Sequence, residues 1–295
     1  HPLVNKMIPV ALRRWRKNLF AKETRAEWQA FKKLLQTEKY DLVLDAQGLL
    51  KSAFVASFAK GKRAGLNFNS AREPLASLFY QQKVNVDKKQ HAINRTRRLF
   101  ADALGYAFQD TVPDYGVDRK KLTTGLSSDD YLVFLHGTTW QTKHWPEVYW
   151  TELAKIAEKN NCKIKLPWGN PTEKARAERI ASQVTNAEVL PKLKIQEVVK
   201  ILAGAKAIVA VDTGFGHLAA ALDVPTISLY GPTDPVLTGT LGASQKHLVS
   251  DFSCSPCLSR ECLLKDRESF SVQPPCFSVL PPETVWAAVS VLLFK

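Results

Sequence analysis

Short apolar runs alternate with segments of helical spacing along the second half of the chain. The runs predict buried strands at 131–135, 163–167, 207–211 and 226–230, and another strand that begins at 189. Between them, apolar residues recur every three or four positions, which predicts helices over 146–159, 172–183, 195–203 and 216–222. Strands that alternate with helices are typical of a parallel, doubly wound sheet.

The first half shows the same alternation less completely. It predicts helices over 23–36, 49–59 and 91–104 and a strand over 41–45. Residues 106–128 are rich in Asp, Gly, Thr and Ser, which is typical of a linker. We therefore predict two α/β domains, 1–123 and 124–295, with a cleft between them.

Charge separates the two halves. Residues 1–127 hold 24 Lys and Arg against 11 Asp and Glu, whereas residues 128–295 hold 17 of each, so the first half carries the whole net charge of +13. This asymmetry favours a polyanionic partner for the first half, although solvated basic helix faces would give the same count. No apolar run reaches 18 residues and no leader pattern precedes the first helix, so we expect a cytoplasmic protein that does not span a bilayer.

The strand over 207–211 ends in a candidate anion site. Asp212, Thr213, Gly214, Gly216 and His217 follow it, and a helix begins there. Glycines allow close backbone approach, the helix amides attract phosphate, and Asp212 would accept sugar hydroxyls. The alternative is a helix cap and turn with a structural histidine. The run also matches a dinucleotide fingerprint, but the next strand ends in a turn and not in an acidic residue, which disfavours a nicotinamide enzyme.

Two further clusters follow predicted strands. Thr138, Thr139 and Lys143 come after the strand over 131–135, where hydroxyls and a mobile cation suit a phosphate, or a simple helix cap with an exposed Lys. Glu173 follows the strand over 163–167 and would bind ribose hydroxyls or complement a helix dipole. Because the carboxyl ends of parallel strands share one edge, we expect the three clusters to converge.

Basic and cysteine-rich segments complete the candidate chemistry. Arg13, Arg14, Arg16 and Lys17 surround Trp15 and would bind phosphate or carboxylate groups, and Arg72 would join them unless Glu73 neutralises it. Four cysteines have the spacing C-x2-C-x4-C-x13-C, for which a Zn or Fe site, free thiols and disulfides are all open interpretations. These are Cys254, Cys257, Cys262 and Cys276; we expect the fifth, Cys162, to be buried and inert.

Several of these segments occur in the order found in a known family. The chain resembles the lipopolysaccharide heptosyltransferase I family, within glycosyltransferase family 9, from residue 1 to about 240. The resemblance implies a GT-B fold of two Rossmann-like domains. It also implies inverting transfer of L-glycero-D-manno-heptose from ADP-heptose to the inner Kdo of Kdo2-lipid A, at the cytoplasmic face of the inner membrane, with no cofactor required. The segments that carry it are DAQGLLKS (45–52), REPLASLFY (72–80), KHWP (143–146), LPWG (166–169), DTG with His217 (212–217) and YGPTDP (230–235).

The resemblance also implies roles for single residues. Thr138, Thr139 and Lys143 would bind the diphosphate, Glu173 the ribose, and the backbone of Leu193 the adenine. Heptose and pyrophosphate would meet Asp212, Thr213, Gly214 and His217. The acceptor side would include Arg13, Arg14, Arg16, Lys17 and Arg72.

Two departures from the family pattern change the expectation. The family's first strand and its Gly-Asp-x-x-His loop, whose Asp is the general base, do not occur here, so we expect a donor-binding fragment without that base. Asp45, at a strand end, is expected to be structural. Residues 251–276 look more like the tails of related heptosyltransferases, so a heptosyltransferase II-like or protein-directed enzyme remains an alternative. A nucleic-acid-binding protein is disfavoured because Trp15 alone is interleaved with the basic residues.

Overall fold

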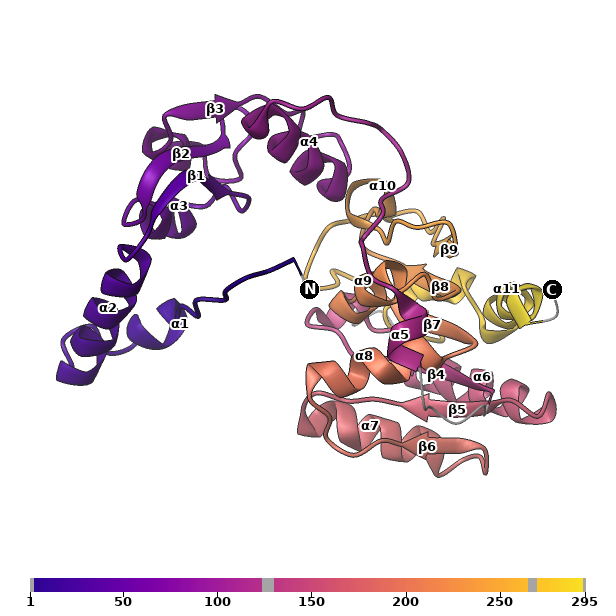
Figure 1. Cartoon of the computed structure of the whole chain (residues 1–295). Helices are drawn as coiled ribbons and strands as arrows, with labels where there is room; N and C mark the ends of the chain where they lie inside the picture. Colours follow the sequence, from indigo (N-terminus) through magenta and orange to yellow (C-terminus); the bar gives the residue numbers. More distant parts are fainter. Residues whose placement is uncertain (1–2, 124–129, 265–269, 294–295) are drawn as a thin grey trace. The chain divides into compact units, whose positions relative to one another are not determined.

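Contacts divide the chain into two units, His1–Asp110 and Thr111–Lys295. The computed structural model describes residues 3–123, 130–264 and 270–293 (Figure 1). The sequence prediction placed the domain boundary after residue 123. By contacts, residues 111–123 belong with the second unit, because Arg119 in helix α5 (Arg119–Thr123) donates hydrogen bonds to the carbonyls of Ala203 and Ala205, each 2.7 Å long. Part of the predicted linker is therefore a packed helix.

The first unit contains a three-stranded parallel sheet of order β1-β2-β3. The predicted strand over 41–45 lies within β1, but β2 was not predicted, since its sequence KGKRAGL has no apolar run. The elements of this unit, in chain order, are α1 (Leu12–Trp15), α2 (Lys22–Leu35), β1 (Lys39–Asp45), α3 (Leu50–Ala56), β2 (Lys60–Leu66), the 3-10 helix η1 (Pro74–Phe79), β3 (Gln82–Val84) and α4 (Ala92–Leu104).

The second unit contains a six-stranded parallel sheet of order β6-β5-β4-β7-β8-β9. Strand β4 (Tyr131–Leu135) pairs with β5 (Lys163–Leu166) on one side and with β7 (Ala207–Val211) on the other. The chain therefore reverses its direction of winding between β4 and β7, which is where open parallel sheets bind ligands. The outer strands are β6 (Ala187–Val189), β8 (Thr226–Tyr230) and β9 (Gln245–Val249).

Helices cover both faces of this sheet. Along β4, Leu132 and Phe134 pack with helices α6, α7 and α11, whereas Val133 and Leu135 pack with α8 and α9. Successive side chains of a strand point to opposite faces, so a strand buried on both must be apolar throughout. The helices are α6 (Glu147–Lys159), α7 (Pro171–Ala181), α8 (Ile195–Gly204), α9 (Gly214–Ala221), the short α10 (Pro235–Thr238) and α11 (Pro282–Leu293).

The predicted strands and helices of the second half are present, with small shifts at their ends. Helix α9 begins at Gly214, two residues before its predicted start, because Thr213 is extended and caps it. Strand β9 and helix α11 were not predicted. Within the described residues, no helix combines the length and apolar character needed to cross a membrane.

A substitution of Phe134 tests the assignment of the core of the second unit. Its ring is fully buried and lies 5.3 Å from that of Trp150, measured between centroids. We expect Phe134→Ala to lower the free energy of unfolding by about 3–5 kcal/mol, through lost burial and the cavity left behind. Val148→Ala, at a position 55% exposed on α6, should change it by less than about 0.5 kcal/mol. Urea unfolding followed by tryptophan fluorescence measures both, and equal losses would contradict the core assignment.

Candidate functional site

A cavity of about 340 Å³ opens at the carboxyl ends of β4, β5 and β7. The three clusters predicted to converge all reach this cavity. Of the residues predicted to bind the donor, only Leu193, the predicted adenine contact, is not among its lining residues. Leu193 is partly buried and packs on the core beside α8. The lining consists of Leu135, Gly137, Thr138, Thr139, Lys143, Pro167, Trp168, Gly169, Glu173, Asp212, Thr213, Gly214, Phe215 and His217.

Asp212 connects the strand ends around this cavity. Its buried carboxylate lies 2.7 Å from Lys143 Nζ and accepts a 2.8 Å hydrogen bond from the Thr233 hydroxyl. Its backbone carbonyl accepts a bond from Thr138 Oγ1 at 2.9 Å. Lys143 ends the 3-10 helix η2 (Gln141–Lys143), and its ammonium lies 4.4 Å from the centre of the Trp140 ring. One carboxylate and one ammonium thus join loops that follow three strands.

Helix α9 presents its amino end to the same cavity. Thr213 caps the helix without a side-chain hydrogen bond, and Gly216 N donates to the Thr213 carbonyl at 3.1 Å, so the amides of Gly214 and Phe215 are the ones that can meet an anion. Burial lowers the pKa of His217; the nearby Lys143 lowers it further, whereas Asp212 opposes the shift. His217 is therefore a neutral imidazole at neutral pH, suited to hydrogen bonding and not to charge pairing.

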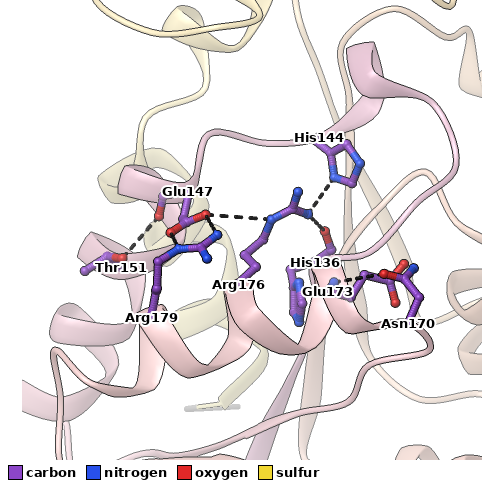
Figure 2. A network of polar contacts seen from close by, with 8 residues as sticks. All are labelled: His136, His144, Glu147, Thr151, Asn170, Glu173, Arg176 and Arg179. Carbon is purple, nitrogen blue, oxygen red and sulfur yellow. Dashed lines mark hydrogen bonds and ion pairs between the residues drawn. The ribbon is translucent and has the colours of Figure 1, made fainter.

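Glu173 reaches the cavity from the first turn of α7 (Figure 2). The Asn170 side chain caps the helix by accepting from Glu173 N at 3.0 Å, and the Glu173 carboxylate accepts from Gly169 N at 2.7 Å. The carboxylate also lies against Gly137, where an added Cβ would be 2.7 Å from Glu173 Cδ. The missing side chain at Gly137 therefore makes room for the acid.

The predicted acceptor-side residues lie in the first unit. Arg13, Arg14, Arg16 and Lys17 line a separate cavity of about 1510 Å³, and Arg72 is not among its lining residues. The cavity wall is also apolar, with Trp28, Phe54 and Phe58 among its residues.

Two of the residues in the basic cluster are committed to internal contacts. Arg14 donates to the Glu27 carboxylate at 2.9 and 2.5 Å, and the Trp15 indole N–H donates to the same group at 2.6 Å. Trp15 is buried against Trp28 and Phe31. Arg14 is therefore paired with Glu27, and Trp15 belongs to the packed interior of the unit.

Glu73 and Asp45 hold the loop before α3. Glu73 accepts from Leu50 N at 2.6 Å, and among the described residues no ion pair joins its carboxylate to the exposed Arg72. Asp45 is buried and accepts from the Ser52 hydroxyl at 2.7 Å and the Tyr80 hydroxyl at 2.6 Å. Burial and the Asp45 carboxylate raise the pKa of Tyr80. The structural role expected for Asp45 agrees with these contacts.

The cysteine segment, which contains Cys254, Cys257, Cys262 and Cys276, contacts loops that border the 340 Å³ cavity. All five cysteines are free thiols, and Cys162 is half-buried. Within the described residues, no group of three or more His, Cys, Asp or Glu side chains is arranged to hold a metal ion, so the metal interpretation finds no support in this geometry. Burial, with the other three cysteines of the segment, raises the pKa of Cys276 to about 12.

Backbone contacts tie this segment to the site. Leu258 N donates to the Pro232 carbonyl at 2.8 Å, one residue before Thr233, and Ser255 Oγ donates to the Gly231 carbonyl. Thr142 Oγ1 donates to the Ser259 carbonyl at 2.7 Å, next to Lys143. The segment therefore supports both partners of Asp212.

Sequence reasoning assigned no role to Thr233. It lies 21 positions after Asp212, in a turn that the sequence indicated only as a loop. Its place in the segment YGPTDP was the available signal, since that segment follows a buried strand at the same sheet edge.

The chain belongs to glycosyltransferase family 9, the heptosyltransferases, whose family model matches residues 28–267. Lipopolysaccharide heptosyltransferase 1 of Pseudomonas aeruginosa is 52% identical over 301 residues, which covers 99% of this chain and 85% of the relative. That coverage includes residues 251–276, so the expectation that the similarity ends near residue 240 is wrong.

Solved structures confirm the predicted GT-B fold. Escherichia coli heptosyltransferase WaaC with ADP matches with a TM-score of 0.86 and 42% identity, over 99% of this chain and 85% of that chain. WaaC with ADP-2-deoxy-2-fluoro heptose matches with a TM-score of 0.83 and 42% identity, over 99% and 84%. The protein is therefore a glycosyltransferase of the heptosyltransferase class.

Gly137 provides a test of the cavity geometry. We expect Gly137→Ala to push the Glu173 carboxylate away from Gly169 N, because the added methyl group would overlap with the carboxylate. ADP affinity should then fall about as far as in Glu173→Gln, and the double variant should add little further loss. Calorimetric titration with ADP measures this, and fully additive losses would show that the two residues act separately.

Proposed function

We propose that the protein transfers L-glycero-D-manno-heptose from ADP-heptose to the inner Kdo of Kdo2-lipid A, with inversion at the anomeric carbon. The observation that carries the proposal is the cavity in which Lys143, two threonine hydroxyls and the amino end of α9 face the carboxylates of Asp212 and Glu173. Cationic and amide donors suit a diphosphate, while carboxylates suit hydroxyl groups. An ADP-sugar offers both.

The donor-binding roles follow from this division. Thr138, Thr139, Lys143, Thr213 and Gly214 surround the space proposed for the diphosphate. Departure of ADP places negative charge on the leaving oxygen, and donors fixed in advance stabilise that charge. At the two ends, Glu173 would accept from the ribose hydroxyls, and Asp212 with His217 would contact the heptose. The backbone of Leu193 remains the proposed adenine contact.

Inversion requires a base within hydrogen-bond reach of the attacking acceptor hydroxyl. Asp45 does not suit this role, since Ser52, Tyr80 and the Gln47 N–H already donate to its carboxylate. The proposal therefore assigns donor binding and leaving-group stabilisation to the described residues, and no base.

The acceptor would meet the basic side of the first unit. Kdo carboxylates and lipid A phosphates are anionic, and Arg13, Arg16 and Lys17 line the cavity there. Arg72 is an exposed cation of the same unit. An anionic membrane surface would attract this unit in the same way, which supports the proposed position of the enzyme at the cytoplasmic face of the inner membrane.

Calorimetric titration tests the proposed donor. ADP and ADP-heptose should bind, whereas NAD and a DNA oligomer at the same concentration should give no response. Binding of NAD or DNA without a response to ADP would overturn the proposal.

Substitutions of Asp212 and Lys143 should distinguish contacts to the sugar from contacts to the diphosphate. Asp212→Ala should weaken ADP-heptose binding more than ADP binding, because its carboxylate would contact the sugar. Lys143→Ala should weaken both alike, because both ligands carry the diphosphate. Equal losses for the two ligands in Asp212→Ala would reassign that carboxylate to holding Lys143.

Substitution of Arg13 and Arg16 should affect binding of the acceptor and not binding of the donor. We expect Arg13→Ala with Arg16→Ala to weaken binding of the lipid acceptor about tenfold or more, from lost charge-assisted hydrogen bonds, and to leave ADP affinity intact. Arg14→Ala is the matched comparison, since it removes a cation already bound to Glu27 and should act mainly on stability. Thermal unfolding and acceptor affinity, measured on both variants, distinguish these outcomes.

A further inference from the structure

Behind the donor cavity, one guanidinium group connects two of its loops. Arg176 Nη1 donates to the His136 carbonyl at 3.0 Å and lies 2.7 Å from His144 Nδ1 (Figure 2). His136 directly follows β4 and precedes Gly137, Thr138 and Thr139. His144 directly follows Lys143. The same arginine therefore holds the near ends of both segments proposed to bind the diphosphate.

Helix α7 places Arg176 there for a geometric reason. Arg176 comes three residues after Glu173, and residues three apart lie on the same side of a helix. Glu173 faces the cavity, and the Arg176 side chain, only 17% exposed, lies behind it. One turn of α7 thus supplies both a lining carboxylate and the contact to the segment that follows β4.

The contact fixes the state of His144. Arginine has only donors, so Nδ1 of His144 must accept and the ring must be neutral. Burial lowers the pKa of His144 and the charge of Arg176 lowers it further, while the carbonyls of His136 and Thr138 and the Glu173 carboxylate oppose the shift. At neutral pH the ring is therefore in the form that the hydrogen bond needs.

Arg176 also lies near a carboxylate. Its Nε lies 3.9 Å from the Glu147 carboxylate, which Arg179 binds through two hydrogen bonds of 2.6 and 2.7 Å (Figure 2). Arg179 lies one turn further along α7, and its bonds go to Glu147 and to neither loop of the cavity. Arg179 can therefore serve as a control, because it is an arginine of the same helix whose side chain binds Glu147.

We propose that Arg176 is a positioning residue of the donor site, which aligns Thr138, Thr139 and Lys143 through the His136 carbonyl and the His144 ring. This inference rests on the proposed donor role of the cavity. Without the guanidinium, a buried carbonyl loses its donor and the two segments lose their common anchor. Displacement of catalytic groups by about 1 Å can cost about 100-fold in rate.

The primary test compares Arg176→Met with Arg179→Met by calorimetric titration with ADP. We expect about 10- to 100-fold weaker binding for Arg176→Met and a change of less than about twofold for Arg179→Met. Circular dichroism and thermal unfolding establish that both variants fold. Wild-type affinity in Arg176→Met, or equal losses in the two variants, would overturn the inference. If the wild-type protein itself failed to bind ADP, the proposed function would fall instead.

A second readout follows the His144 ring by NMR. In Arg176→Met the pKa of His144 should rise, because one of the charges that lowers it is gone, and in Arg179→Met it should stay unchanged. A merely structural loss elsewhere on α7 would not move it.

His144→Phe covers the case in which Arg176→Met does not fold. This substitution removes only the acceptor on the ring, so ADP binding should weaken more than in Arg179→Met. In Arg176→Lys, whose ammonium replaces the two-sided guanidinium, the loss should lie between those in Arg176→Met and Arg179→Met. Unchanged ADP affinity in both variants would overturn the inference.

Discussion

The pairing of β4 with β7 is the constraint on which the site depends. These strands are far apart in the sequence, yet their register places Leu135 beside Ala210, so the chain leaves both strands at the same edge. The residues that line the cavity then come from the strand ends, from the loops beyond that edge and from the first turns of the helices that follow. The buried, fully apolar character of both strands fixes the register, because a shift by one residue would turn each side chain to the other face.

The charges in the cavity are divided by function. Lys143 and the amino end of α9 supply the positive potential, since burial lowers the pKa of His136 to about 4 and also lowers those of His144 and His217. Three histidines near the site thus contribute no positive charge at neutral pH. The carboxylates of Asp212 and Glu173 are compatible with an anionic ligand only where that ligand presents hydroxyl groups, which is the pattern of a sugar nucleotide.

The sequence predicted those parts of the site that depend on strand ends. Asp212, Lys143 and Glu173 could be placed together because parallel strands bring their carboxyl ends to one edge whatever the side chains do. Strand β2 escaped prediction, since its first four residues include three basic ones and it lacks the apolar run that reveals a buried strand. Partners such as Thr233 for Asp212, Glu27 for Arg14 and Gly137 for Glu173 depend on tertiary packing, which no local pattern records.

The ion pair between Lys143 and Asp212 has a consequence for ligand selectivity. The ammonium already has a buried carboxylate at 2.7 Å, so the cavity carries its own counterion and not an unmatched positive charge. A small inorganic anion would have to separate this pair and offers no hydroxyl groups to the released carboxylate. A nucleotide sugar brings a phosphate for the cation and hydroxyl groups for the acid, so it can engage both members of the pair. Such a pair would favour a nucleotide sugar over inorganic phosphate by the chemistry at both of its ends.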